Sequence, residues 1–204
     1  MVESQVRTND VTDRRLQAAL RQVERERFVP AERAAFAYAE LALPVEGARA
    51  LWAPRDLAKL AQAAAVQEGE AVLVIGGAEA YAAAVFAAMG AQVTVLETPG
   101  LAAAARTRLD AAGVAAAVVA GDLATAPGGP YDVIFVDGAV ETTPPAWAEA
   151  LKPGGRMALV AAEGPIGKAR LYARSPAGAV SYRIVFDSSP PKLGDLDAAP
   201  AFTF

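Results

Sequence analysis

Three short motifs in the middle of the chain could together bind a nucleoside. A turn of small residues at 76–80 follows the apolar run AVLVI, Glu97 ends the run AQVTVLE, and Asp122 follows AAAVVAG. A glycine turn at the start of a helix exposes backbone amides to a ligand. An acid about 20 residues further on can accept hydrogen bonds from a ribose diol, and another carboxylate can accept one from an exocyclic amino group. The order of these motifs therefore predicts a nucleoside site.

Parallel strands are needed to bring the three motifs to one place. From residue 71 the sequence alternates apolar runs with alanine-rich helical stretches. We expect strands at 71–75, 91–97, 115–122, 131–138 and 156–162, helices at 81–90, 101–113 and 145–151, and a turn at 152–155. This alternation predicts a doubly wound parallel sheet. In such a sheet, ligands bind at the carboxyl ends of the strands.

The end of the chain departs from this alternation. Residues 170–175 and 181–189 read as two strands joined by the turn SPAG, with no helix between them. A dinucleotide-binding Rossmann domain would continue with another strand–helix–strand unit, whereas a closing antiparallel hairpin is typical of class I methyltransferases. We therefore predict an α/β fold with a mostly parallel, Rossmann-like, seven-stranded sheet that ends in an antiparallel β-hairpin. An irregular closing segment is expected at 190–204.

The first residues of the chain predict an amphipathic helix. Apolar residues recur at helical spacing at Leu16, Leu20 and Val23. Asp10 or Thr12 could cap this helix. It should stop near residues 28–30, because Pro30 disfavours helix in the residue before it.

The segment between this helix and the first strand is less regular. Residues 34–54 read as apolar and partly extended, and residues 55–66 read as a second helix. We expect one domain over 1–204, made of an N-terminal helical extension at 1–66 and a Rossmann-like core at 67–204.

Composition and charge exclude several kinds of chemistry. The chain of 204 residues contains no His and no Cys, which excludes disulfides, thiol nucleophiles and histidine-based triads, and we predict no metal site. A net charge of −4 and a pI near 5.0 argue against nucleic-acid binding and against an anionic membrane surface. No apolar run suits a membrane span and the first residues lack a signal-peptide core, so we expect a cytoplasmic protein. A homodimer or another protein partner stays open.

Five stretches of the sequence resemble the protein-L-isoaspartate O-methyltransferase family, and together they span almost the whole chain. They are MVESQVRTNDVTDRRLQAALRQVERERFVP, YAELALPVEGARALWAP, VLVIGGAEAY, YDVIFVDGA and LKPGGRM. The first is specific, because most methyltransferases lack such an N-terminal segment. The resemblance implies S-adenosylmethionine as cofactor and methyl esterification of the carboxylate at isoaspartyl sites in proteins or peptides.

The resemblance also implies where the cofactor lies. The positions that fall in its binding motifs are Gly76, Gly77, Ala78, Tyr81, Glu97, Thr98, Asp122 and Leu123. No catalytic residue is predicted, because the family's serine beside the methyl-accepting carboxylate corresponds to Trp52 here. A carboxylate nucleophile is ionised at neutral pH, so the reaction needs no general base and the absence of His does not exclude it.

Several residues depart from the family pattern at the methionine end of this site. Val74 stands where the family has an acid that helps to hold the methionine amino group, and Glu79 replaces a small polar residue near the cofactor carboxylate. Ala78 and Ala80 replace glycines, and alanine costs about 1–2 kcal/mol wherever the backbone is left-handed.

Together with Trp52, these departures leave two functions open. One is an active protein carboxyl methyltransferase. The other is a catalytically inactive family member that acts as a ligand-binding or protein-interaction scaffold. A nicotinamide-dependent oxidoreductase is disfavoured, because the full G-x-G-x-x-G pattern is absent and the terminal hairpin opposes it.

Overall fold

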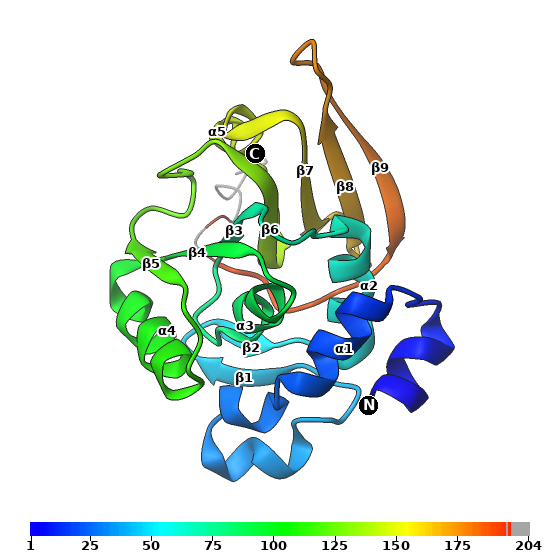
Figure 1. Ribbon diagram of the computed structural model, residues 1–204, viewed down its shortest axis with the longest axis vertical. Helices are drawn as coiled ribbons and strands as arrows, with labels where there is room; N and C mark the ends of the chain where they lie inside the picture. The colour runs from blue at the N-terminus through cyan, green and yellow to red at the C-terminus, as the bar shows by residue number, and fades with distance from the viewer. Residues whose placement is uncertain (195, 197–204) are drawn as a thin grey trace, which may run out of the picture.

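A seven-stranded sheet forms the centre of the computed structural model, which describes residues 1–194 and 196 (Figure 1). In spatial order its strands are β5 (Ala117–Ala120), β4 (Gln92–Glu97), β3 (Ala71–Ile75), β6 (Tyr131–Val140), β7 (Leu151–Ala161), β8 (Lys168–Arg174) and β9 (Val180–Asp187). The first five are parallel, and β8 and β9 form an antiparallel hairpin beside β7. The predicted mostly parallel sheet with a closing hairpin is confirmed.

Apolar side chains on the two faces of the sheet form two cores. In β3, Val72 and Val74 belong to one core and Leu73 and Ile75 to the other, as the two-residue period of a strand requires. The first core includes residues of α2 (Pro54–Ala64), α3 (Tyr81–Ala88) and α4 (Pro99–Ala111), and the second includes α5 (Pro145–Glu149). Burial on both faces explains why these strands read as continuous apolar runs. No helix in the described part of the chain is both long and apolar enough to cross a membrane.

Residues 1–36 pack against α2 and α3. Their longest helix is α1 (Arg14–Gln22), with short helical turns at Val2–Val6, Arg7–Asn9, Arg25–Phe28 and Ala31–Phe36. The predicted continuation of α1 to residue 28 is wrong, because Val23 is extended. The predicted caps are also wrong: the carboxylate of Asp13 caps α1 by accepting hydrogen bonds from the amides of Arg15 and Leu16.

A small antiparallel sheet lies within residues 34–54. Its strands are β1 (Leu43–Glu46) and β2 (Arg49–Leu51). The sequence predicts an irregular, partly extended segment here, so this strand pairing is a correction. Gly47 in the tight connection has φ +56°, a left-handed conformation that glycine adopts without strain. Because β2 is buried throughout, it carries Arg49 into the interior.

Strand β7 begins earlier than the sequence predicts. Residues 152–155, expected as a turn, lie inside β7, because Leu151 already pairs with Tyr131 of β6. The pairing register then shifts before Arg156. The expected turn is therefore present as an irregularity within the strand.

Helix α2 ends at a position that suits glycine better than alanine. Ala65, the residue after α2, has φ +49°, and its amide donates to the carbonyls of Ala61 and Gln62. Because Ala65 is exposed and strained, Ala65→Gly is expected to raise the free energy of unfolding by about 1 kcal/mol. Urea denaturation measures this, with Ala63→Gly inside the helix as a control that should lose about 1 kcal/mol. A loss of stability in both variants would contradict the prediction.

The chain returns across the sheet after β9. Residues 188–194, which we call the closing segment, run from the β9 side of the sheet toward β3, in orange-red in Figure 1. Ala139 of β6 holds this segment: its amide donates to the Pro191 carbonyl and its carbonyl accepts from the Leu193 amide, both at 3.0 Å. Residues 190–194 are irregular, as predicted, whereas residues 188 and 189 were predicted to be part of the last strand, which ends at Asp187. Residues 195 and 197–204 of the predicted tail lie outside the described residues.

Candidate functional site

The predicted turn and acids come together at the carboxyl ends of β3, β4 and β5. These strands are parallel neighbours, so the residues that follow them share one edge of the sheet. Backbone hydrogen bonds join them: the Gly76 amide donates to the Leu96 carbonyl at 3.0 Å, and the Gly121 amide donates to the Glu97 carbonyl at 2.9 Å. The three motifs thus lie on one edge, while their binding role stays a prediction.

The turn between β3 and α3 is tight and buried. Gly76 has φ +82° and Ala80 has φ +65°, so both ends of the turn are left-handed. Alanine at position 80 is therefore strained by about 1–2 kcal/mol, as its replacement of glycine implied. The Ala80 amide donates to the Gly77 carbonyl at 3.0 Å, and Arg108 Nη1 donates to the Ala78 carbonyl at 2.8 Å. These bonds fix the turn at the start of α3.

A buried ion pair occupies the end of β4. The two carboxylate oxygens of Glu97 accept hydrogen bonds from Arg49, at 2.8 Å from Nη2 and 2.9 Å from Nε. The Thr98 amide donates to Glu97 at 2.7 Å, and Arg49 Nη1 donates to the Leu193 carbonyl at 2.6 Å. Both side chains are almost fully buried. The acid predicted to accept a ribose diol is thus already paired within the protein.

Leu193 of the closing segment fills the space next to two glycines. A Cβ atom on Gly138 would lie 2.4 Å from Leu193 Cδ2, and one on Gly76 would lie 2.5 Å from the same atom. Leu193 is buried in the second core. The closing segment therefore packs directly on the glycine turn, and a ligand at Gly76 has to displace Leu193.

Gly138→Ala is expected to lower the free energy of unfolding by about 1–3 kcal/mol, because the new methyl group overlaps Leu193. In a Leu193→Ala background the same substitution should cost much less, since the overlapping atoms are gone. A double-mutant cycle by urea denaturation measures this coupling. Additive effects would show that the Leu193 side chain does not occupy this space.

Glu79 in the turn and Asp137 in the second half of β6 form a buried pair of carboxyl groups, which we call the carboxyl pair. They are 1% and 3% exposed, and within the described residues their side-chain oxygens accept no hydrogen bond from any group outside the pair. Burial, then repulsion from Asp137, raises the pKa of Glu79 well above its ordinary value. Burial raises the pKa of Asp137 to about 6, although the hydrogen bond with Glu79 lowers it. The pair therefore holds a proton more readily than two separate carboxyl groups in water.

Arg25 and Tyr81 add further buried polar atoms to this region. Arg25 is close enough to Asp137 to lower its pKa, and its guanidinium lies 4.7 Å from the centre of the Tyr81 ring. Arg25 donates to the Ala37 carbonyl at 2.7 Å and to the Trp52 carbonyl at 2.6 Å. In the described structure, Arg25 Nη1 and the Tyr81 hydroxyl are buried without a partner. Such a concentration of unpartnered polar atoms is typical of a polar ligand site.

Trp52 and Val74, which stand where the family has a serine and an acid, both pack in the core. Trp52 is almost fully buried, and its ring centroid lies 6.4 Å from that of Phe135. Val74 is fully buried beneath the turn, since a Cβ atom on Gly77 would lie 3.0 Å from Val74 Cγ1. Val74 offers no polar group to a ligand, and Trp52 offers only the N–H of its indole.

The remaining predicted cofactor positions have local structural roles. Asp122 is exposed, and one of its carboxylate oxygens accepts from the Ala124 amide at 2.9 Å, which stabilises a turn. Leu123 is buried, and its carbonyl accepts from Trp147 Nε1 at 2.9 Å. Thr98 precedes α4 without a side-chain cap bond. A cofactor role for these residues stays a prediction.

Sequence reasoning missed Arg49, Asp137 and Leu193. Asp137 could have been found by the rule that identified Glu97, because it is also an acid near the carboxyl end of an apolar strand. Arg49 and Leu193 carry no such local signal. Arg49 meets Glu97 across 48 residues of chain and Leu193 across 144.

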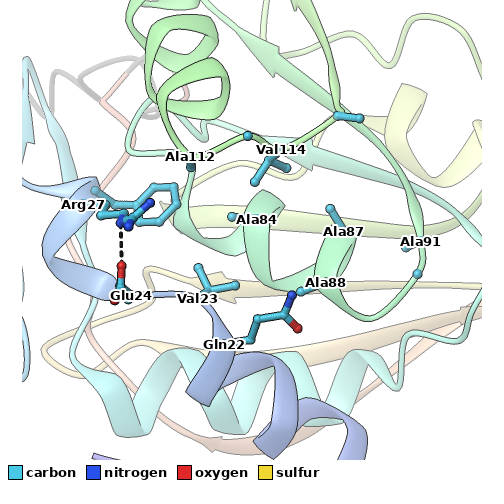
Figure 2. A pocket seen from close by; sticks show the side chains of 14 residues that line it. Gln22, Val23, Glu24, Arg27, Ala84, Ala87, Ala88, Ala91, Ala112 and Val114 are labelled. Atoms are coloured by element: carbon cyan, nitrogen blue, oxygen red, sulfur yellow. Dashed lines mark ion pairs between the residues drawn. The ribbon is translucent and has the colours of Figure 1, made fainter.

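A separate cavity of about 460 Å³ lies away from this edge (Figure 2). Figure 2 shows Val23 of the extension, Ala84 and Ala88 of α3 and Val114 around it, with the Glu24–Arg27 ion pair at one side. None of the predicted cofactor positions lines the cavity. Because the cavity extends along α3 to its far end, while the glycine turn precedes the helix, it is not the predicted nucleoside site.

Comparison with known proteins points to one family. The family model described as Protein-L-isoaspartate(D-aspartate) O-methyltransferase (PCMT) matches residues 1–184. A protein-L-isoaspartate O-methyltransferase of Methylorubrum populi is 40% identical over 162 residues, which cover 78% of this chain and 76% of the relative. One of Koribacter versatilis is 33% identical over 210 residues, which cover 98% of this chain and 92% of the relative.

Solved structures share the fold. A protein-L-isoaspartate O-methyltransferase superposes with a TM-score of 0.74 at 24% identity, covering 94% of this chain and 64% of its own, so this chain spans just under two thirds of that protein. A putative protein-L-isoaspartate O-methyltransferase from Plasmodium falciparum, in complex with S-adenosyl-L-homocysteine, superposes with a TM-score of 0.75 at 15% identity. That match covers 92% of this chain and 94% of the other. At these identities the likeness establishes the fold.

Proposed function

The chain belongs to the protein-L-isoaspartate(D-aspartate) O-methyltransferase family, and we propose that it transfers a methyl group from S-adenosylmethionine to the carboxylate of isoaspartyl residues in proteins or peptides. The observation that carries this proposal is the family match over residues 1–184, which includes the N-terminal extension as well as the sheet. The family uses S-adenosylmethionine, and the related Plasmodium falciparum structure contains S-adenosyl-L-homocysteine.

The residues at the edge of the sheet suit this cofactor chemically. We assign the ribose to Glu97 and the backbone of Thr98, and the cofactor chain to the turn that begins at Gly76. The unpartnered buried polar atoms around Tyr81 support a polar ligand at this place. When bound, S-adenosylmethionine supplies an electrophilic methyl group on a sulfonium. The chain's own task is to hold an ionised carboxylate in line with that group, which is a matter of positioning.

The ribose position is closed by the protein itself in this structure. Arg49 occupies both carboxylate oxygens of Glu97, and Leu193 lies against Gly76. A ribose diol therefore competes with Arg49 for the same oxygens. We propose that Arg49 and the closing segment move when the cofactor enters.

Stability with and without S-adenosyl-L-homocysteine tests the cofactor assignment. Ligand at about 100 times its dissociation constant should raise the free energy of unfolding by about 2.7 kcal/mol. Glu97→Gln should reduce this gain, because an amide is a weaker acceptor for the diol than a carboxylate. Unchanged thermal unfolding of the wild-type protein at about millimolar ligand would contradict the assignment.

Methyl transfer from labelled S-adenosylmethionine to an isoaspartyl peptide tests the reaction. The same peptide with ordinary aspartate is the control, and transfer is expected only to the isoaspartyl form. Ligand binding without any transfer would instead favour the second candidate function, a ligand-binding or protein-interaction scaffold.

A further inference from the structure

The carboxyl pair holds the unbalanced charge of the proposed cofactor site. Three acids, Glu79, Asp137 and Glu97, and two arginines, Arg25 and Arg49, influence one another across this edge of the sheet. With every group ionised, these five described side chains carry one negative charge more than their positive charges. Because Arg49 is bound to Glu97 and Arg25 donates to backbone carbonyls, the excess falls on the carboxyl pair.

Buried carboxyl groups need donors, and the pair has few ways to find them. Within the described residues, no donor from outside the pair reaches the side-chain oxygens of Glu79 or Asp137. One shared proton satisfies them only in part, whereas an ammonium group offers three donors and a full positive charge. A bound metal ion is not favoured, since the described residues contain no group of three or more side chains placed to hold one.

We propose that the carboxyl pair binds the cationic end of the nucleoside cofactor and gives up a proton when it does so. This inference rests on the proposed function. Without ligand the pair holds a proton, and when an ammonium or sulfonium group takes its place that proton leaves to solvent. No covalent bond changes in this exchange. Val74 has no carboxylate to hold the methionine amino group. In this chain, Glu79 from the turn and Asp137 from β6 take that role together.

The exchange makes the site selective for positive charge. S-adenosylmethionine carries a sulfonium and an ammonium, S-adenosyl-L-homocysteine carries only the ammonium, and 5′-deoxy-5′-methylthioadenosine carries neither. Ligands with a cationic group should therefore release a proton on binding, and the uncharged thioether should not. The direction of this linkage follows because the pair binds protons only while the cation is absent.

Isothermal titration calorimetry in two buffers of different ionisation enthalpy measures the proton directly. At about pH 7, binding of S-adenosylmethionine to the wild-type protein should release about one proton. Glu79→Gln should release almost none and should bind S-adenosylmethionine about tenfold more weakly or worse, with unchanged affinity for 5′-deoxy-5′-methylthioadenosine. Glu68→Gln, at an exposed position outside the site, is the matched control and should behave as wild type.

The outcomes separate this inference from the proposed function. Equal affinity and equal proton release in wild type and Glu79→Gln would overturn the inference and leave the function intact. No binding of any of the three nucleosides to the wild-type protein would overturn both. Proton release with both S-adenosyl-L-homocysteine and S-adenosylmethionine supports the inference and shows that the pair binds the ammonium group. Proton release with S-adenosylmethionine alone also supports it, and shows that the pair binds the sulfonium group. Circular dichroism checks that Glu79→Gln is folded.

Discussion

Asp137→Asn is expected to raise the free energy of unfolding at about pH 8 by about 3 kcal/mol and to flatten its dependence on pH. Burial raises the pKa of Asp137 from an ordinary value of 3.8 to about 6 in the folded protein. A difference of about two pKa units between the folded and unfolded chain corresponds to about 3 kcal/mol. Asparagine avoids this cost, and its amide can also donate to the carboxylate of Glu79.

The raised pKa fixes the sign of the pH dependence. The contribution of Asp137 to stability is fully present below about pH 3.8 and is lost as the pH rises through about 6, because the unfolded chain ionises first. Glu79, whose pKa is also raised, extends the loss to higher pH. Around Asp137, Glu97 of β4 acts in the same direction as burial, and Arg49 of β2 and Arg25 of the extension oppose it.

Urea denaturation at about pH 4.5, 6 and 8 measures this prediction. Wild type should lose stability over the series, while Asp137→Asn should change much less. Asp110→Asn, at an exposed position of α4, is the control and should keep the wild-type slope. If Asp137→Asn keeps that slope as well, Asp137 is not the buried group that titrates.

The sheet could be predicted because its strands are marked locally. Runs such as 71–75 and 131–138 are apolar throughout, and only a strand buried on both faces needs that pattern. The errors in predicting secondary structure lie in segments whose conformation depends on the strand with which they pair. Residues 43–51 become two strands because they pair with each other, and residues 152–155 join β7 because Leu151 pairs with Tyr131. The division into an extension at 1–66 and a core stays a prediction.

The sequence predicted which strand ends lie together, but not the side chains that surround them. The strand-end rule located Glu97, yet Arg49, its partner, approaches from a distant segment that no local pattern connects to it. From the sequence, Glu79 is interpreted as an acid placed near the cofactor carboxylate. The structure adds Asp137 beside it, and a buried pair of acids suits a cationic group of the ligand better than an anionic one.

Arg49→Met is expected to lower the free energy of unfolding by about 3–5 kcal/mol, because it leaves the buried carboxylate of Glu97 without its cation. Arg49→Met combined with Glu97→Leu should recover most of this loss, since an apolar pair of similar volume carries no buried charge. Lys168→Met at the surface pair Lys168–Asp187 is the control and should cost less than about 1 kcal/mol. Urea denaturation measures all three, and a loss at Arg49 as small as that at Lys168 would contradict the prediction.

If Glu97 binds the ribose as proposed, the same ion pair also sets the cost of opening the site. In wild type, a ribose diol has to displace Arg49 from both oxygens of Glu97, so part of the binding free energy is spent on breaking the pair. In Arg49→Met the Glu97 carboxylate keeps the Thr98 amide as a donor but loses its cation, so the diol relieves a buried charge. Stabilisation by S-adenosyl-L-homocysteine should therefore be larger in Arg49→Met than in wild type. A smaller stabilisation would show that Arg49 contacts the ligand and does not compete with it.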